Sequence, residues 1–155
     1  MSAATSSEAA VDIRLADYQP PPWLCPNIEL AFDLGVDFTE VSARLHVKPN
    51  PEVAPAPLRL DGESLELLSV SVDGERLGIE DYELQSRALL LPSVDRAAVV
   101  ETRVRIHPAA NTRLEGLYAS GGMLLTQCEA EGFRRITFFP DRPDVLSVYD
   151  VTLRA

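Results

Sequence analysis

Apolar and polar residues alternate along most of this chain, which is the pattern of a β-strand with one buried face. The alternation is regular over residues 28–34 and again over residues 38–47. Only residues 35–37, which include Gly35, separate the two runs. Because this gap is short, we expect the two strands to form an antiparallel hairpin.

Turn residues divide the remainder of the chain into further short strands. Residues 49–57 are rich in proline, so we expect a surface loop there. Asp73-Gly74 is a hairpin turn signal and predicts that a strand over residues 67–72 turns back on a partner. Helical periodicity is not sustained anywhere, and residues 60–68 and 141–146 are the candidates for a single helical turn. Other strands are expected over residues 82–84, 89–91, 99–107 and 149–153.

This succession of short strands predicts an all-β fold, either an antiparallel β-sandwich or a twisted open sheet. We expect residues 1–22 to form a flexible leader followed by an extended, proline-rich arm. Trp23, the only tryptophan, is expected to anchor that arm. Residues 23–155 show no internal repeat and no linker, and are expected to form a single β domain.

Composition agrees with a soluble globular domain. A chain of 155 residues with 46% hydrophobic residues is long enough to bury a core, and no apolar run approaches the length of a membrane span. The net charge of −10 argues against nucleic-acid binding, because phosphate contacts need clustered Lys and Arg. The acidity suits a cationic partner, such as the free amino terminus of a peptide, and it also suits plain solubility.

The chain lacks recognisable catalytic machinery. It contains two histidines, His46 and His107, which are far apart, and it has no H-E-x-x-H zinc motif, no G-x-S-x-G and no Cys-x-x-Cys. The first residues contain no signal peptide, which favours a cytoplasmic location. Cys25 and Cys128 are therefore expected to be reduced thiols. We predict no catalytic, metal or cofactor residue within these 155 residues.

One stretch departs from the scaffold pattern. Small residues at 119–122 lead into an apolar run, and polar residues follow at once in Thr126-Gln127-Cys128-Glu129. If this run is extended, Gln127 and Glu129 share one face and Cys128 lies on the other. An amide and a carboxylate side by side could hold a cationic ligand. The alternative is that Glu129 is simply solvated.

The same stretch resembles a known family. The string T-Q-C-E-A-E-G-F-R (residues 126–134), followed by I-T-F-F-P-D-R-P-D-V (136–145), is similar to the N-terminal domain of bacterial aminopeptidase N, a zinc metallopeptidase. Asn111-Thr112 and L-E-G-L-Y (114–118) fit the same family. The resemblance covers nearly the whole chain after the leader and implies a twisted, saddle-like β domain.

The resemblance also implies that this segment and a second domain have different roles. A catalytic domain with H-E-x-x-H and G-A-M-E-N motifs would follow Ala155 and would hold the zinc of the full-length enzyme. Glu129 would contact the substrate's α-ammonium group, and Gln127 would line the pocket nearby. Gly132 is expected to supply a backbone geometry that side chains forbid, and Phe133, Phe138 and Phe139 are expected in the core or at the interface with the next domain.

Two functional hypotheses remain. In the first, this segment is the N-terminal domain of a zinc aminopeptidase that removes N-terminal amino acids from peptides. The segment would scaffold the catalytic domain of the same chain, would recognise the free N-terminus of the peptide substrate, and would be inactive alone. In the alternative, the chain is a free-standing, non-enzymatic β-sandwich binding module.

Overall fold

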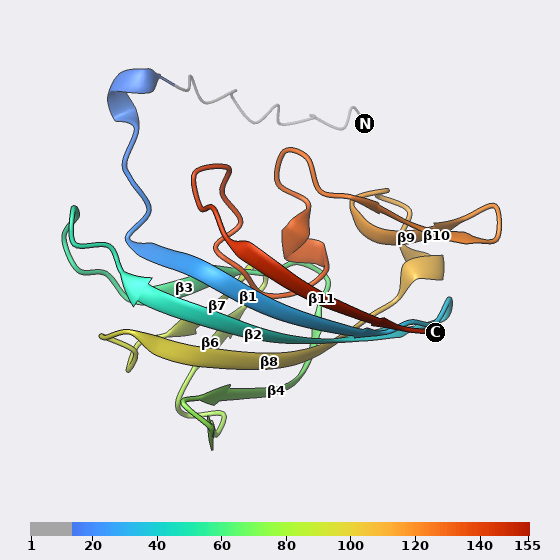
Figure 1. Ribbon diagram of the computed structural model, residues 1–155, viewed down its shortest axis with the longest axis horizontal. Helices are drawn as coiled ribbons and strands as arrows, with labels where there is room; N and C mark the ends of the chain where they lie inside the picture. The colour runs from blue at the N-terminus through green and yellow to red at the C-terminus, as the bar shows by residue number, and fades with distance from the viewer. Residues whose placement is uncertain (1–13) are drawn as a thin grey trace, which may run out of the picture.

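The computed structural model describes residues 14–155, in which two β-sheets face each other across the hydrophobic core (Figure 1). A separate two-stranded hairpin lies to one side of them. The all-β prediction is confirmed, and most strand pairs are antiparallel. The expected leader over residues 1–13 lies outside the described residues, and the domain boundary at residues 22 and 23 stays a prediction.

The larger sheet has six strands and is built around the predicted hairpin. The strand order is β11-β1-β2-β8-β4-β5. Ile28 lies opposite Leu45 and Leu30 opposite Ala43, so the apolar positions of both hairpin strands share one face. The strands are β1 (Trp23–Asp33), β2 (Thr39–Pro49), β4 (Glu66–Val72), β5 (Glu75–Arg76), β8 (Ala98–Ile106) and β11 (Val148–Arg154).

Shorter elements complete the fold. The second sheet has the order β3-β7-β6, and the separate hairpin pairs β9 with β10. Asp73 and Gly74 both have positive φ, 51° and 85°, as the predicted hairpin turn between β4 and β5 requires. These elements are β3 (Leu58–Asp61), β6 (Glu83–Gln85), β7 (Ala88–Leu91), β9 (Gly116–Ser120), β10 (Met123–Gln127), and the 3₁₀ turns η1 (Leu15–Asp17), η2 (Pro108–Ala110) and η3 (Phe133–Arg135).

The two candidate helical turns are wrong. Residues 60–68 contain the end of β3 and the start of β4, and residues 141–146 contain isolated turns only. Strand pairing explains the first case, because Asp61 exchanges backbone hydrogen bonds with Phe139 at N···O distances of 2.8 and 3.1 Å. Those backbone groups are therefore not free to close a helical turn.

The last strand forms where the alternation predicts it, but its pairing differs from the rest. β11 runs parallel to β1, with Tyr149 opposite Ile28 and Leu153 opposite Phe32. A parallel neighbour needs a long crossover connection, and the whole of the second sheet and the hairpin lie between these two strands in sequence. Alternation predicts a strand but does not determine its partner.

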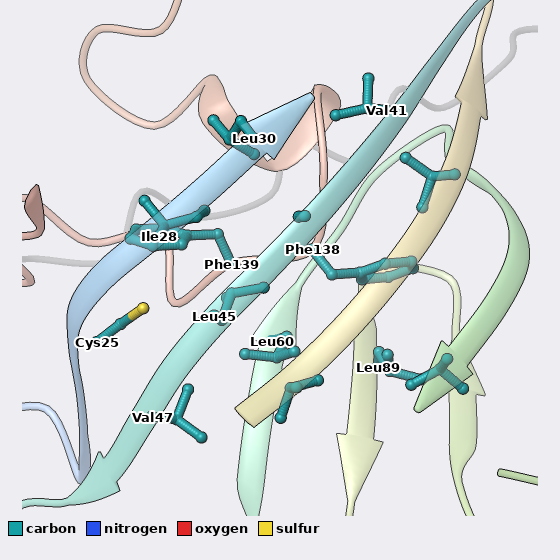
Figure 2. Close-up of a cluster of buried hydrophobic side chains, with 14 of the residues drawn as sticks. Cys25, Ile28, Leu30, Val41, Leu45, Val47, Leu60, Leu89, Phe138 and Phe139 are labelled. Carbon is teal, nitrogen blue, oxygen red and sulfur yellow. The ribbon is translucent and has the colours of Figure 1, made fainter. Parts of the chain in front are cut away.

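The core lies between the two sheets (Figure 2). Residues of β1 and β2 face Leu60 of β3 and Leu89 of β7, with Phe138 and Phe139 among them. Phe138 and Phe139 are 2% and 3% exposed, so these two belong to the core and not to an interface. Trp23 is buried, and its indole Nε1 donates to the Ala56 carbonyl at 2.8 Å, which confirms it as an anchor.

Cys25 and Cys128 are both free cysteines in the structure. Burial raises the pKa of the Cys25 thiol to about 11, and it also raises the pKa of Cys128, with a smaller contribution from the charge of Asp141. Both are therefore protonated at neutral pH and are poor nucleophiles. Among residues 14–155, no helix is long and apolar enough to cross a bilayer.

The burial of Phe138 can be tested against a matched exposed residue. Phe138→Ala should lower the free energy of unfolding by about 3–5 kcal/mol, because it leaves a cavity between the sheets. Phe38 is 50% exposed and packs its ring under the Arg105 guanidinium, 5.0 Å from the ring centroid. Phe38→Ala should cost about 1 kcal/mol. Urea unfolding of both variants measures the difference, and equal losses would contradict the assignment of Phe138 to the core.

Candidate functional site

The Gln127–Glu129 stretch begins at the end of the separate hairpin. β10 pairs with β9 up to Gln127, which lies opposite Gly116, the first residue of β9. The partner strand has no further residue to pair with, and the chain enters a turn after Cys128. Glu129 therefore lies in the turn and not on the strand. The expectation that Gln127 and Glu129 share a strand face is wrong.

A turn over residues 128–132 carries Glu129 instead. The Gly132 N–H donates to the Cys128 carbonyl at 2.9 Å and closes the turn. The Gln127 side-chain Nε2 donates to the Glu129 carbonyl at 3.3 Å, and the Glu129–Ala130 peptide bond is cis. Gln127 and Glu129 therefore remain neighbours, joined by a side chain to backbone contact and not by strand geometry.

Gly132 is required by space and not by an unusual backbone angle. Its φ is −111°, which any residue can adopt. A Cβ at this position would lie 2.7 Å from the Gln127 carbonyl oxygen and 2.9 Å from the Cys128 Cα. The expectation of a forbidden backbone geometry is therefore corrected: the start of the turn passes too close to Gly132 for a side chain.

The side chains of the turn differ in their exposure and in their bonding partners. Gln127 and Glu129 are exposed, and within residues 14–155 the Glu129 carboxylate makes no hydrogen bond or ion pair. Cys128 is half-buried and packs against the core. Glu131 binds the Arg134 guanidinium at 2.9 Å. Of the two glutamates in this turn, Glu129 alone has a carboxylate available for a ligand.

Arg134 attaches the turn to the body of the domain. Its Nε donates to Asp141 Oδ2 at 2.8 Å, its backbone N–H donates to the same oxygen at 3.0 Å, and its Nη2 donates to the Asp141 carbonyl at 2.8 Å. Burial opposes the charged form of Arg134. The hydrogen bond and charge of Asp141, with the charges of Asp61 and Glu131, outweigh that effect and raise the Arg134 pKa.

Arg135 fixes the base of the hairpin in a similar way. Its Nη2 donates to Glu63 at 2.6 Å and its Nε donates to Glu115 at 2.9 Å. Glu115 directly precedes β9, and its carbonyl is also held by the Asn111 side chain at 2.7 Å. Local sequence patterns do not indicate these pairs, because Arg135 reaches Glu115 and Glu63, which are 20 and 72 residues away in the chain.

The histidines do not form part of a metal site. His46 Nε2 lies 3.2 Å from Glu29 on the outer face of the larger sheet, and His107 Nδ1 lies 3.1 Å from the Asp37 carbonyl. Within the described range, no group of three or more His, Cys, Asp or Glu side chains could hold a metal ion. The resemblance assigns the zinc to a catalytic domain beyond these residues, so no step of chemistry is assigned to zinc in this segment.

Comparison with known proteins shows which protein region this chain is homologous to. No family model matches the chain. The chain is 46% identical over 143 residues to aminopeptidase N of Caulobacter vibrioides. The chain is homologous to the N-terminal region of aminopeptidase N. The alignment covers 92% of this chain but 16% of that aminopeptidase N, so the chain spans about a sixth of the relative's length. The resemblance inferred from residues 111–145 is confirmed.

Solved structures share the fold of this chain. Legionella pneumophila aminopeptidase A, crystallised in complex with aspartic acid, matches with a TM-score of 0.83 and 33% identity, over 91% of this chain and 17% of that one. The M1 zinc metallopeptidase of Deinococcus radiodurans matches with a TM-score of 0.69 and 14% identity, over 85% of this chain and 32% of that one. At 14% identity, the second match shows the shared fold alone.

The close packing at Gly132 leads to a prediction about the turn. Gly132→Ala should lower the free energy of unfolding by about 3 kcal/mol, because the added methyl meets backbone atoms that cannot move aside cheaply. The matched control is Gly121→Ala at the tip of the hairpin, where φ is +58° and an added Cβ would meet no atom within 4 Å beyond its chain neighbours. That change should cost about 1 kcal/mol of backbone strain. Thermal unfolding compares the two, and a control loss as large as that of Gly132→Ala would contradict the steric explanation.

Proposed function

We propose that this chain is the N-terminal β domain of a longer zinc-dependent aminopeptidase, called the longer enzyme below. In this proposal the segment supports the catalytic domain of the same protein and recognises the free α-amine of the peptide substrate. The observation that carries the proposal is the unpaired, exposed carboxylate of Glu129, held on an anchored turn in a region homologous to aminopeptidase N.

The chemistry of recognition is simple. A carboxylate forms a charge-assisted hydrogen bond with an ammonium group. A peptide with a blocked amino terminus lacks that charge, so the contact would restrict the longer enzyme to the end of a chain. Gln127 is joined to the same turn and would line the pocket beside the amine. The metal chemistry of peptide hydrolysis would be supplied by zinc bound elsewhere in the longer enzyme.

β11 supplies the surface through which the segment would support the rest of the protein. Tyr149, Val151 and Leu153 lie opposite the buried β1 residues, on the sheet face that covers the core. The alternation of apolar and polar residues along β11 is that of a half-buried strand. These three side chains are nevertheless 47%, 50% and 65% exposed. β11 is also an edge strand. Because the aligned relative is about six times longer, we assign this face to a later segment of the same chain.

This surface distinguishes the two hypotheses. A free-standing binding module would have to leave the apolar face of β11 in water, which promotes association. A domain of a longer protein has that face covered. The exposed apolar face of β11 therefore favours the aminopeptidase domain. We also propose a cytoplasmic location, as expected from the sequence.

Substitution of Glu129 tests the recognition role. Glu129→Gln in the longer enzyme keeps the shape of the side chain and removes its charge. The value of kcat/KM for an alanine anilide should fall about ten- to a hundredfold, the cost of one charge-assisted bond. The control is Glu75→Gln. Glu75 is an exposed glutamate on β5, which lies at the edge of the larger sheet opposite β11, and this variant should retain full activity. Wild-type activity in Glu129→Gln would remove the basis of the proposal.

Hydrogen exchange and dye binding test the β11 face. The 155-residue chain should bind an apolar dye, and Leu153→Ser should reduce that binding, whereas Leu84→Ser on β6, which is 51% exposed, should not. In the longer enzyme, dye binding should be lost and the β11 amides should exchange more slowly, because a later segment covers them. Equal exchange of β11 in the two proteins would show that the rest of the enzyme docks elsewhere.

A further inference from the structure

Among its side-chain ion pairs, the turn that carries Glu129 is linked to the body of the domain through the Arg134 guanidinium. Arg134 holds Glu131 on one side and Asp141 on the other, at 2.9 and 2.8 Å. The Arg134 and Asp141 side chains are only 13% and 9% exposed. An ion pair in such a buried setting has a defined geometry, because water does not compete for its hydrogen bonds.

The link continues into the second sheet. The Asp141 backbone N–H donates to Asp61 Oδ2 at 3.2 Å, and Asp61 ends β3. Asp61 also exchanges two backbone hydrogen bonds with Phe139, whose ring is in the core. A continuous path of contacts therefore runs from the turn through Arg134 and Asp141 to β3. Within the described part of the chain, Glu129 itself contributes no side-chain contact to this path.

The position of the Glu129 carboxylate thus depends on the backbone of the turn. That backbone is fixed by the Gly132 to Cys128 hydrogen bond, by the packing of Cys128 on the core, and by the Glu131–Arg134 pair. The first two constraints lie at the ends of the turn, while Glu131 lies within it. A displacement on the order of 1 Å at a binding group can cost about a hundredfold in rate.

We propose that Arg134 and Asp141 are positioning residues, which hold the turn so that Glu129 meets the substrate amine although neither of them touches it. This inference rests on the proposed function of Glu129. The new element is that the preference for a free amino terminus depends partly on the buried Arg134–Asp141 pair, which lies behind the binding surface.

Arg134→Lys is the informative variant. It keeps the positive charge beside Asp141 but loses the planar fork that reaches Asp141 and Glu131 together. Glu131→Gln is a milder change, which weakens only the end of the link at the turn. The matched control is Arg142→Lys. Arg142 makes a similar two-point pair with Asp144, at 2.8 and 2.7 Å, and it also binds the Gln19 carbonyl of the arm; within residues 14–155 it makes no hydrogen bond or ion pair with residues 128–132.

The first measurement compares inhibition of the longer enzyme by alanine amide and by N-acetylalanine amide. The ratio of the two inhibition constants reports the preference for a free amine. Glu129→Gln should reduce that ratio about tenfold or more, and Arg134→Lys about fivefold, with KM for an alanine anilide raised more than kcat is lowered. Arg142→Lys should leave the ratio within about twofold of wild type, even where thermal stability falls.

The second measurement needs no activity. Hydrogen exchange of residues 128–132 in the 155-residue chain should be about fivefold faster in Arg134→Lys and measurably faster in Glu131→Gln, relative to the amides of β2. Arg142→Lys should not change it. Unchanged exchange in Arg134→Lys would overturn the positioning role, whatever the kinetics show.

The two proposals fail in different ways. If Glu129→Gln leaves the inhibition ratio unchanged, the amine-recognition function is wrong and the role of Arg134 in amine preference falls with it. If Glu129→Gln reduces the ratio but Arg134→Lys does not, only the positioning proposal is overturned. If Arg142→Lys reduces the ratio as much as Arg134→Lys, the effect reflects general destabilisation and the proposal is likewise overturned.

Discussion

The burial of Phe138 and Phe139 between the two sheets is the constraint on which the rest of this structure depends. Each buried phenylalanine contributes about 1.5–3 kcal/mol relative to an exposed ring. The backbone at Phe139 is paired with Asp61 of β3, so the aromatic segment is fixed in register as well as in depth. The turn that carries Glu129 lies just before this segment and β11 follows soon after it. Both proposed functional surfaces are thus positioned by the same core contact.

Electrostatics distinguishes Glu129 from the other glutamate of its turn. The chain has 24 acidic and 14 basic residues. Within residues 14–155, Arg44, Arg105, Arg134 and Arg135 each pair with two carboxylates. Arg134 and Arg135 in η3 form ion pairs with the carboxylates around the turn and at the base of the hairpin, including that of Glu131. Glu129, two residues earlier, is left without a partner in the described part of the chain. A surface glutamate is usually solvated, but one left unpaired beside neutralised neighbours presents a localised negative charge to a ligand.

Alternation and turn residues predicted most of the strands, because each depends on local geometry that neighbouring residues encode. Asp73-Gly74 is a clear case, since both residues must adopt positive φ. The pairing of β11 with β1 is encoded by contacts distant in sequence, and alternation cannot reveal it. The end of β10 depends on where its partner begins, at Gly116, so the sequence placed Glu129 on a strand that stops two residues earlier. The ion pair between Arg134 and Asp141 could not be recognised from the sequence either, because its strength depends on the burial of both side chains, which only the folded structure shows.

Amine recognition and domain support are connected by the dielectric environment. In this chain the Glu129 carboxylate faces water, where an ion pair about 4 Å apart is worth only about 1 kcal/mol. The same contact becomes several times stronger when water is excluded. A second surface must therefore close over the turn before Glu129 can discriminate a free amine from a blocked one. The apolar face of β11 is where the remaining protein would attach, and its attachment would bring that covering surface into place. In the proposed arrangement, the segment would gain its recognition function only within the longer enzyme, where water is excluded around the exposed Glu129 carboxylate.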